Sequence, residues 1–77
     1  MKLSSQEIMV LVYIALGYSD REVADKMNLS YYTVRTYIDR ATLKLAARNK
    51  INAAFKCLIE IAPEEFMQIL RDSKEVL

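Results

Sequence analysis

The sequence contains few of the residues that metal sites, disulfides and phosphate loops require. Its 77 residues include no histidine, no tryptophan, one cysteine, one glycine and one proline. A chain without histidine and with a single cysteine has no obvious set of metal ligands and no internal disulfide, which favours a reducing, cytoplasmic setting. One glycine cannot make a glycine-rich phosphate loop, and no group of carboxylates marks a catalytic pocket. We therefore expect neither an enzyme nor a bound cofactor.

Long apolar runs are also absent. The longest, from Ile8 to Leu16, is half the length of a membrane span, and the first residues show no signal peptide, so we expect no membrane segment. The scarcity of glycine, proline and β-branched runs predicts an all-α fold. Hydrophobic residues make up 53% of the chain, which is generous for a single small domain. This excess suggests that another chain covers part of the apolar surface.

The net charge of +1 conceals an uneven distribution along the chain. Residues 35–56 hold six cations against Asp39 alone, a local charge of +5. Residues 58–77 hold five carboxylates against two cations, a local charge of −3. A basic middle segment suits a polyanionic partner because local potential, rather than net charge, attracts it. Ordinary solvated helix faces would give the same pattern.

Two capping boxes mark the starts of the first two predicted helices. Ser4 with Glu7 predicts a helix from Ser5 to Leu16, which Gly17 ends in a left-handed conformation. Its inward face is expected to hold Ile8, Leu11, Val12 and Ala15. Ser19 with Glu22 predicts a second, shorter helix that runs to about Met27.

The segment from Ser19 to Leu45 has the pattern of a helix-turn-helix. Asn28 tolerates the left-handed turn after the second helix, and Leu29 is expected to fill the corner. Ser30 then caps a third helix that should extend to about Ala46, with Val34, Ile38, Ala41 and Leu45 facing inward. In this motif the second of the two helices enters the major groove of DNA, and its first turns touch base edges.

The last third of the chain predicts two more helices. One runs from about Asn49 to Ile61 and is apolar on two sides, so it lies either within the fold or at an interface. Pro63 suits the first position of a fifth helix. These elements divide the chain into a helix-turn-helix domain over residues 1–62 and a helical extension over residues 63–77.

From Leu3 to Ala54 the chain resembles, without a gap, the DNA-binding domain of the LuxR/GerE family. The matching residues follow in order: Leu3-Ser4, Glu7, Val10-Leu11, Gly17, Ser19, Glu22-Val23-Ala24, Leu29-Ser30, Thr33-Val34-Arg35, Ile38, Leu45 and Asn49-Lys50. The resemblance implies a four-helix fold and a transcription regulator that binds two-fold symmetric DNA as a dimer, usually through the fourth helix. Since the chain has no room for a receiver or ligand-binding domain, it resembles the stand-alone, GerE-like members.

Three positions depart from the family pattern. Arg35 stands where lysine is common, which keeps the charge and adds bidentate geometry. Asp39 stands where a neutral or basic residue is usual; it would repel phosphate but can accept from the amino group of cytosine. Ala46-Ala47 replace a pair that usually begins with glycine, so we expect a less sharp turn before the fourth helix.

We expect the DNA-binding residues to lie on the third helix and just after it. Arg35 is positioned to read guanine, whereas the tyrosines at the helix start could meet a phosphate. The full set of candidates is Ser30, Tyr31, Tyr32, Thr33, Arg35, Thr36, Asp39, Arg40, Lys44, Arg48 and Lys50. A dimer interface is expected along one side of the fourth helix, at Ala53, Cys57 and Ile61.

Two other functions remain open. The low net charge and Asp39 are compatible with a helix-turn-helix scaffold that binds another regulator through the fourth helix. The segment YTVRTYIDRATLKL also resembles the recognition helix of sigma-factor region four, which implies a reader bound to RNA polymerase. The expected partners are thus double-stranded DNA and a second copy, or alternatively a regulator or polymerase, in the nucleoid of a bacterial or phage-infected cell.

Overall fold

The computed structural model describes residues 2–60 together with Glu64, Met67, Gln68 and Arg71. Within these residues there are four helices and no strand: α1 (Ser5–Ala15), α2 (Asp20–Met27), α3 (Tyr31–Lys44) and α4 (Lys50–Glu60). The predicted all-α, four-helix fold is confirmed. The fifth helix predicted over residues 63–77 lies outside the described residues, apart from the four single positions named above.

A capping serine comes directly before each of the first three helices. Ser4 and Ser19 form complete capping boxes with Glu7 and Glu22, as the sequence predicted. Ser30 caps α3 alone, through a 3.0 Å hydrogen bond from the backbone amide of Thr33 to its hydroxyl. Because these bonds join residues only three positions apart, each serine fixes its helix start locally.

The same three helices end in one motif. Just beyond each end, a backbone amide donates to a carbonyl five residues earlier: Tyr18 to Tyr13, Leu29 to Ala24 and Ala47 to Thr42. In this motif the residue directly before the donating amide lies at positive φ. Gly17 (φ 100°), Asn28 (φ 56°) and Ala46 (φ 52°) occupy these positions.

Ala46 is the exception among the three, because glycine and asparagine tolerate the left-handed region, whereas the β-carbon of alanine is unfavourable there. We expected an alanine to make this turn less sharp, but Ala46 adopts the backbone conformation that glycine would adopt. The Lys56 ammonium of α4 donates to the carbonyls of Leu45 and Ala46, at 3.2 and 3.3 Å. These hydrogen bonds help to hold the turn, because they satisfy carbonyls that the end of α3 leaves free.

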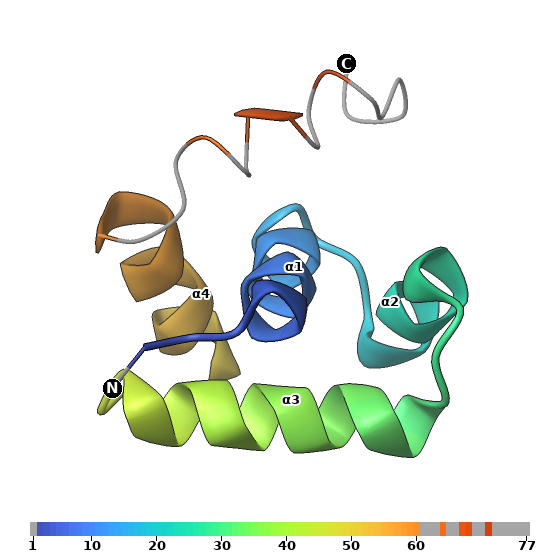
Figure 1. Ribbon diagram of the computed structural model, residues 1–77, viewed down its shortest axis with the longest axis horizontal. Coiled ribbons are helices and arrows are strands. Elements are labelled where there is room, and N and C mark those ends of the chain that lie inside the picture. Colours follow the sequence, from blue (N-terminus) through green and yellow to red (C-terminus); the bar gives the residue numbers. More distant parts are fainter. Residues whose placement is uncertain (1, 61–63, 65–66, 69–70, 72–77) are drawn as a thin grey trace.

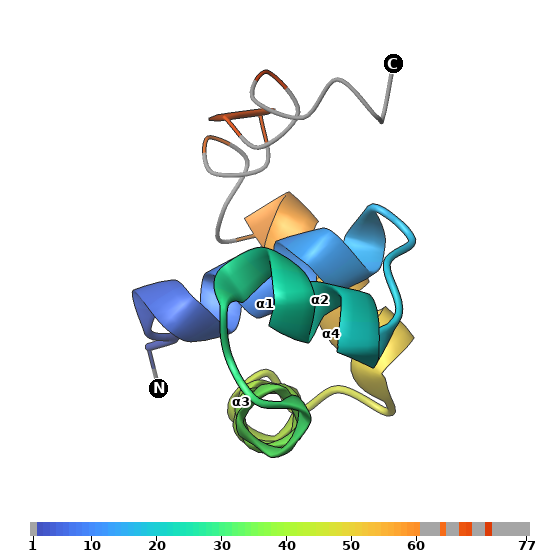
Figure 2. The ribbon, with the colours of Figure 1, turned by 90° about the vertical axis from the view of Figure 1, so that its right-hand side faces the viewer.

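Helix α1 is the centre of the fold and packs against the other three helices. Figure 1 shows α3 running beneath α1, α2 and α4, and in Figure 2 α3 is seen nearly end-on, with no other helix on its far side. One whole face of α3 is therefore left uncovered.

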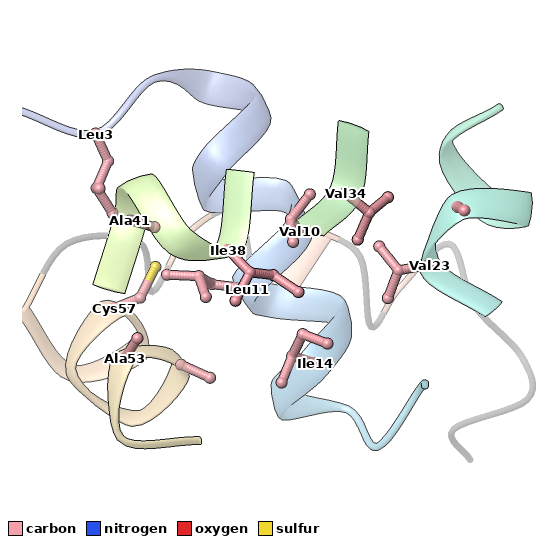
Figure 3. Close-up of a cluster of buried hydrophobic side chains, with 12 residues drawn as sticks. Leu3, Val10, Leu11, Ile14, Val23, Val34, Ile38, Ala41, Ala53 and Cys57 are labelled. Carbon is pink, nitrogen blue, oxygen red and sulfur yellow. The ribbon is translucent and has the colours of Figure 1, made fainter. Parts of the chain in front are cut away.

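The core is a single apolar cluster contributed by all four helices. In Figure 3, Leu11 of α1 lies among Ile38 of α3 and Cys57 of α4. Each large side chain buried here contributes about 1.5–3 kcal/mol.

On α1 the inward face differs from the prediction. Val10 and Ile14 are buried along with Leu11 and Val12, whereas Ala15 is exposed and Ile8 is only partly buried.

Helix α4 turns toward the core the side on which a dimer interface was expected. Ala53, Ala54 and Cys57 are buried, whereas Ile51, Phe55 and Ile59 are each more than 60% exposed. Ala53 and Cys57 were expected at a dimer interface, but their side chains have no accessible surface. That expectation is corrected for both residues, because small side chains let α4 approach α1 closely. Ile61 lies outside the described residues.

Candidate nucleic-acid interface

Helix α2, the turn at Asn28 and helix α3 form the predicted helix-turn-helix. Val23 of α2 and Val34 of α3 are fully buried, and the partly buried Leu29 packs against the same core from the turn. This packing fixes the direction of α3, because the two helices share one apolar contact across a short connection. The motif therefore presents the uncovered face of α3 as a rigid surface.

The uncovered face of α3 is polar and aromatic. Its exposed side chains include Tyr32, Arg35, Thr36, Asp39 and Arg40, all of them predicted DNA-binding residues, and the helix also exposes the apolar Leu43 near its end. The buried side of the same helix holds Val34, Ile38 and Ala41, again as predicted. The 3.6-residue periodicity of α3 separates these two faces.

Three of the predicted hydroxyl contacts are already used within the helix. The Ser30 hydroxyl donates to the Thr33 hydroxyl at 2.9 Å, in addition to accepting the Thr33 amide. The Thr36 hydroxyl donates to the carbonyl of Tyr32 at 3.0 Å. Ser30, Thr33 and Thr36 therefore stabilise the first turns of α3, and each hydroxyl oxygen still has capacity to accept a further bond.

Two tyrosines crowd the start of α3. Their rings meet edge to face at 5.7 Å, and Tyr32 is 80% exposed. The Arg21 guanidinium of α2 lies 4.9 Å from the centre of the Tyr31 ring. Such a contact holds the half-buried Tyr31 ring against α2 and leaves Tyr32 pointing to solvent. The sequence reasoning did not include Arg21.

The main feature missed from the sequence is a carboxylate that joins two of the predicted cations. Asp20, the first residue of α2, accepts from Arg35 Nη1 at 3.0 Å and from Lys50 Nζ at 2.9 Å. The Asp20 side chain is only 9% exposed, whereas that of Arg35 is 44% exposed. An acidic residue after a capping serine is ordinary in a first helical turn, so nothing in the sequence singled it out.

The charges at this site are mutually stabilised. Burial raises the pKa of Asp20, but hydrogen bonds from Lys50 and Arg35 outweigh it and hold the pKa below its ordinary value. The hydrogen bond to Asp20 in turn raises the pKa of the Arg35 guanidinium. Both shifts favour the charged forms of Asp20 and Arg35 at neutral pH.

Lys44 was predicted to contact phosphate, and the structure gives it a different partner. Its ammonium donates to both carboxylate oxygens of Glu7, at 2.9 and 3.2 Å. Glu7 is buried, and its pKa is lowered because bonds from Lys44 and Ser4 together exceed the raising effect of burial. Lys44 therefore stabilises the packing of α3 against α1, and its contact with phosphate stays a prediction.

A shallow depression lies beside the exposed face of α3. It has a volume of about 440 Å³ and is lined by the second half of α3 and the start of α4, including Arg35, Asp39, Asn49 and Lys50. The start of α4 is capped by a 2.8 Å bond from the Asn52 amide to the Asn49 side chain. The exposed Arg48 lies next to it in the turn. The predicted residues Arg35, Asp39 and Lys50 thus meet at this depression, near Arg48.

A second surface of interest is apolar and lies across α1 and α4. A hollow of about 210 Å³ is lined by Ile14 and Ala15 of α1 and by Ile51, Ala54, Phe55 and Leu58 of α4. Ile51 and Phe55 are largely exposed here. None of the described residues that line this hollow is basic, so it differs in character from the exposed face of α3.

Among the described residues, no group of histidine, cysteine or acidic side chains is arranged to hold a metal ion. The described helices are also all too short or too polar to cross a membrane.

Comparison with known proteins agrees with this geometry. Residues 1–57 match the GerE model, described as bacterial regulatory proteins of the luxR family. The chain is also 36% identical over 52 residues to the HTH-type transcriptional activator RamA of Corynebacterium glutamicum. That alignment covers 68% of this chain but 18% of RamA, so the chain spans less than a fifth of its relative. No solved structure matches the chain significantly.

Proposed function

Since the chain belongs to the LuxR family of bacterial regulatory proteins, we propose that it is a sequence-specific DNA-binding transcription regulator whose helix α3 enters the major groove. The observation that carries this proposal is the uncovered face of α3, with its exposed Arg35 and Arg40. A helix of this width fits the major groove, and its side chains can reach base edges there.

The proposal gives the residues of this face different tasks. Arg35 reads a base edge, for which guanine O6 and N7 are the best acceptors, and Asp39 accepts from a neighbouring cytosine amino group. Arg40, Arg48 and Lys50 contact phosphates on either side of the groove. The start of α3, with its free amides, lies against the phosphate backbone of the DNA. The residues that place it there are Ser30, Tyr31, Tyr32, Thr33 and Thr36.

We further propose that the regulator is a homodimer and that the apolar face of α4 forms the contact. Ile51, Phe55 and Ile59 replace the buried Ala53 and Cys57 as the interface residues. Three large exposed apolar side chains on one short helix are a large apolar surface for so small a domain, and such patches mark interaction sites. A regulator of this kind would act at the nucleoid, in the cytoplasm.

A protein partner is the second candidate, and one observation favours it. Leu43 is 77% exposed near the end of α3 and lines the depression that contains Asp39. An apolar side chain beside a carboxylate is better suited to a protein surface, such as another regulator or RNA polymerase, than to phosphate.

Selection from a random duplex pool tests these proposals directly. At about 100 mM salt, where phosphate contacts are still effective, we expect enrichment of two inverted half-sites about one helical turn apart. Arg35→Ala should then weaken binding by about 1–3 kcal/mol and relax one base position. A single enriched half-site would reject the dimer. No enrichment would reject DNA recognition and favour the protein partner.

A further inference from the structure

The carboxylate of Asp20 is the point at which three helices meet. It belongs to α2, yet its two oxygens accept from Arg35 of α3 and from Lys50 of α4. The buried position of the carboxylate fixes it in space, because it is part of the packed start of α2. The two cations are longer and more exposed, and without Asp20 they would sample many rotamers.

The way in which Arg35 binds Asp20 leaves most of the guanidinium available. A single nitrogen, Nη1, makes the contact with Asp20 Oδ2. A guanidinium has five N–H donors, so its other edge can still form a bidentate pair with an outside acceptor. Lys50, with three donors and one bond to Asp20 Oδ1, has donors left as well.

We propose that Asp20 is a positioning residue for sequence recognition: it holds the guanidinium of Arg35 and the ammonium of Lys50 in fixed places, and remains bound to them when DNA is present. The inference rests on the proposed function, because it assigns a role in reading DNA. It makes specificity depend on a carboxylate that itself contacts neither base nor phosphate.

The burial of Asp20 distinguishes this role from an alternative in which Asp20 masks the two cations until a DNA phosphate displaces it. If DNA removed both cations, the Asp20 carboxylate would be left buried and unpaired, which is strongly unfavourable. The lowered pKa of Asp20 agrees with a carboxylate that stays charged and bound. A masking carboxylate would have to become hydrated once DNA displaced it from the cations. The Asp20 side chain is only 9% exposed, so water cannot reach it well enough.

In the test, loss of the Asp20 charge and loss of its positioning role have opposite expected effects on binding. Asp20→Asn removes one negative charge from the DNA-binding face, which by charge alone should tighten binding to every duplex. Asp25→Asn makes the same charge change at an exposed site on the same helix and is the matched control. Both variants are titrated with the selected duplex and with a scrambled duplex of equal length and composition.

We expect Asp20→Asn to lower the ratio of selected to scrambled affinity by about tenfold, with lost preference at the base that Arg35 reads. Asp25→Asn should shift both affinities by the same factor. Asp20→Glu, which keeps the carboxylate, should recover part of the ratio. If Asp20→Asn leaves the ratio unchanged or raises it, Asp20 acts only through its charge or by masking the cations, and the inference is wrong.

A measurement on the unaltered protein covers the case in which Asp20→Asn does not fold. Nitrogen-15 NMR of the Arg35 guanidinium should show restricted rotation in the free protein and in the complex. Free rotation in either state would overturn the inference. A wild-type chain that prefers no duplex would contradict the proposed function instead, so the two failures are distinguishable.

Discussion

Lys44 and Glu7, 37 residues apart, form an ion pair that joins the end of α3 to the start of α1. The ammonium bonds to both carboxylate oxygens, at 2.9 and 3.2 Å, while Glu7 Oε1 also accepts the amide of Ser4 at 2.8 Å. One carboxylate thus caps α1 and fixes α3 against it. The helix that we propose reads DNA is therefore oriented in part by a buried charge pair.

Removing one partner of this pair should be costly. Lys44→Met leaves the Glu7 carboxylate, 3% exposed, without its cation, and we expect a loss of about 3 kcal/mol in the free energy of unfolding. Glu7→Gln keeps a cap acceptor and should cost less. In urea denaturation of both variants and the double variant, a coupling of about 1–3 kcal/mol is expected. Simple additivity would show that the pair contributes nothing.

The pair also predicts how stability depends on pH. The folded state lowers the pKa of Glu7 from 4.5 and that of Asp20 from 3.8, so the unfolded chain binds more protons in acid. Their contribution is fully present above these values and is lost as pH falls through the lower folded-state pKa values. Denaturation between neutral pH and strong acid should therefore show stability falling below about pH 4.5. This fall should be shallower in Glu7→Gln, and equal slopes would contradict the assignment.

Replacing Ala46 with glycine should stabilise the protein. Ala46 holds φ 52°, and relief of its β-carbon strain exceeds the entropic cost of glycine, for a net gain of about 0.5–1 kcal/mol. Ala47→Gly is the matched control, because its φ is not positive and glycine there should destabilise. Thermal unfolding of the two variants measures the difference. A lower melting temperature for Ala46→Gly would show that the turn is not strained.

A charge on the apolar face of α4 should prevent dimer formation. Phe55 is 61% exposed, so Phe55→Glu should leave the fold intact while placing a carboxylate within the proposed contact. We expect mass measurement in solution to give a dimer for the wild type and a monomer for Phe55→Glu. Leu43→Glu, at an apolar site on α3 that is 77% exposed, should remain dimeric. A dimer lost through Leu43→Glu instead would place the contact on the other face.

The salt dependence of binding should identify the phosphate contacts. Arg40→Gln removes an exposed cation from the proposed interface, so the slope of log affinity against log salt should fall by about 0.9. The control is Lys26→Gln, because the Lys26 ammonium lies over the Tyr18 ring, 4.9 Å from its centre. Its slope should match the wild type. An unchanged slope for Arg40→Gln would remove Arg40 from the interface.

The parts of the fold that the sequence predicted correctly are those set by short-range chemistry. Ser4 with Glu7 and Ser19 with Glu22 are three residues apart, so their capping bonds follow from the sequence alone. Asn28 likewise adopts its left-handed turn because of its own conformational preference. The inward face of α3 followed from helical periodicity, since Val34, Ile38 and Ala41 lie on one side.

The errors came where two faces of a helix were equally apolar. On α4 the apolar residues surround much of the helix, and hydrophobicity alone could not show that Ala53 and Cys57 turn inward while Phe55 turns outward. Size made the difference, because small side chains permit close packing against α1. The turn at Ala46 was misjudged for another reason. Hydrogen bonds from Lys56, ten residues later, help to hold this turn, and local sequence preferences do not reveal them.

The sequence by itself determined the four helices, the starts of the first three, the turns at Gly17 and Asn28, and the face of α3 that remains uncovered, because each depends on residues within about one helical turn. Only the tertiary structure decided what the charged residues do. Glu7 meets Lys44 across 37 positions, and Asp20 meets Arg35 and Lys50 across 15 and 30. Long flexible side chains can choose among many partners, and the packing of the helices brings only some of those partners within reach.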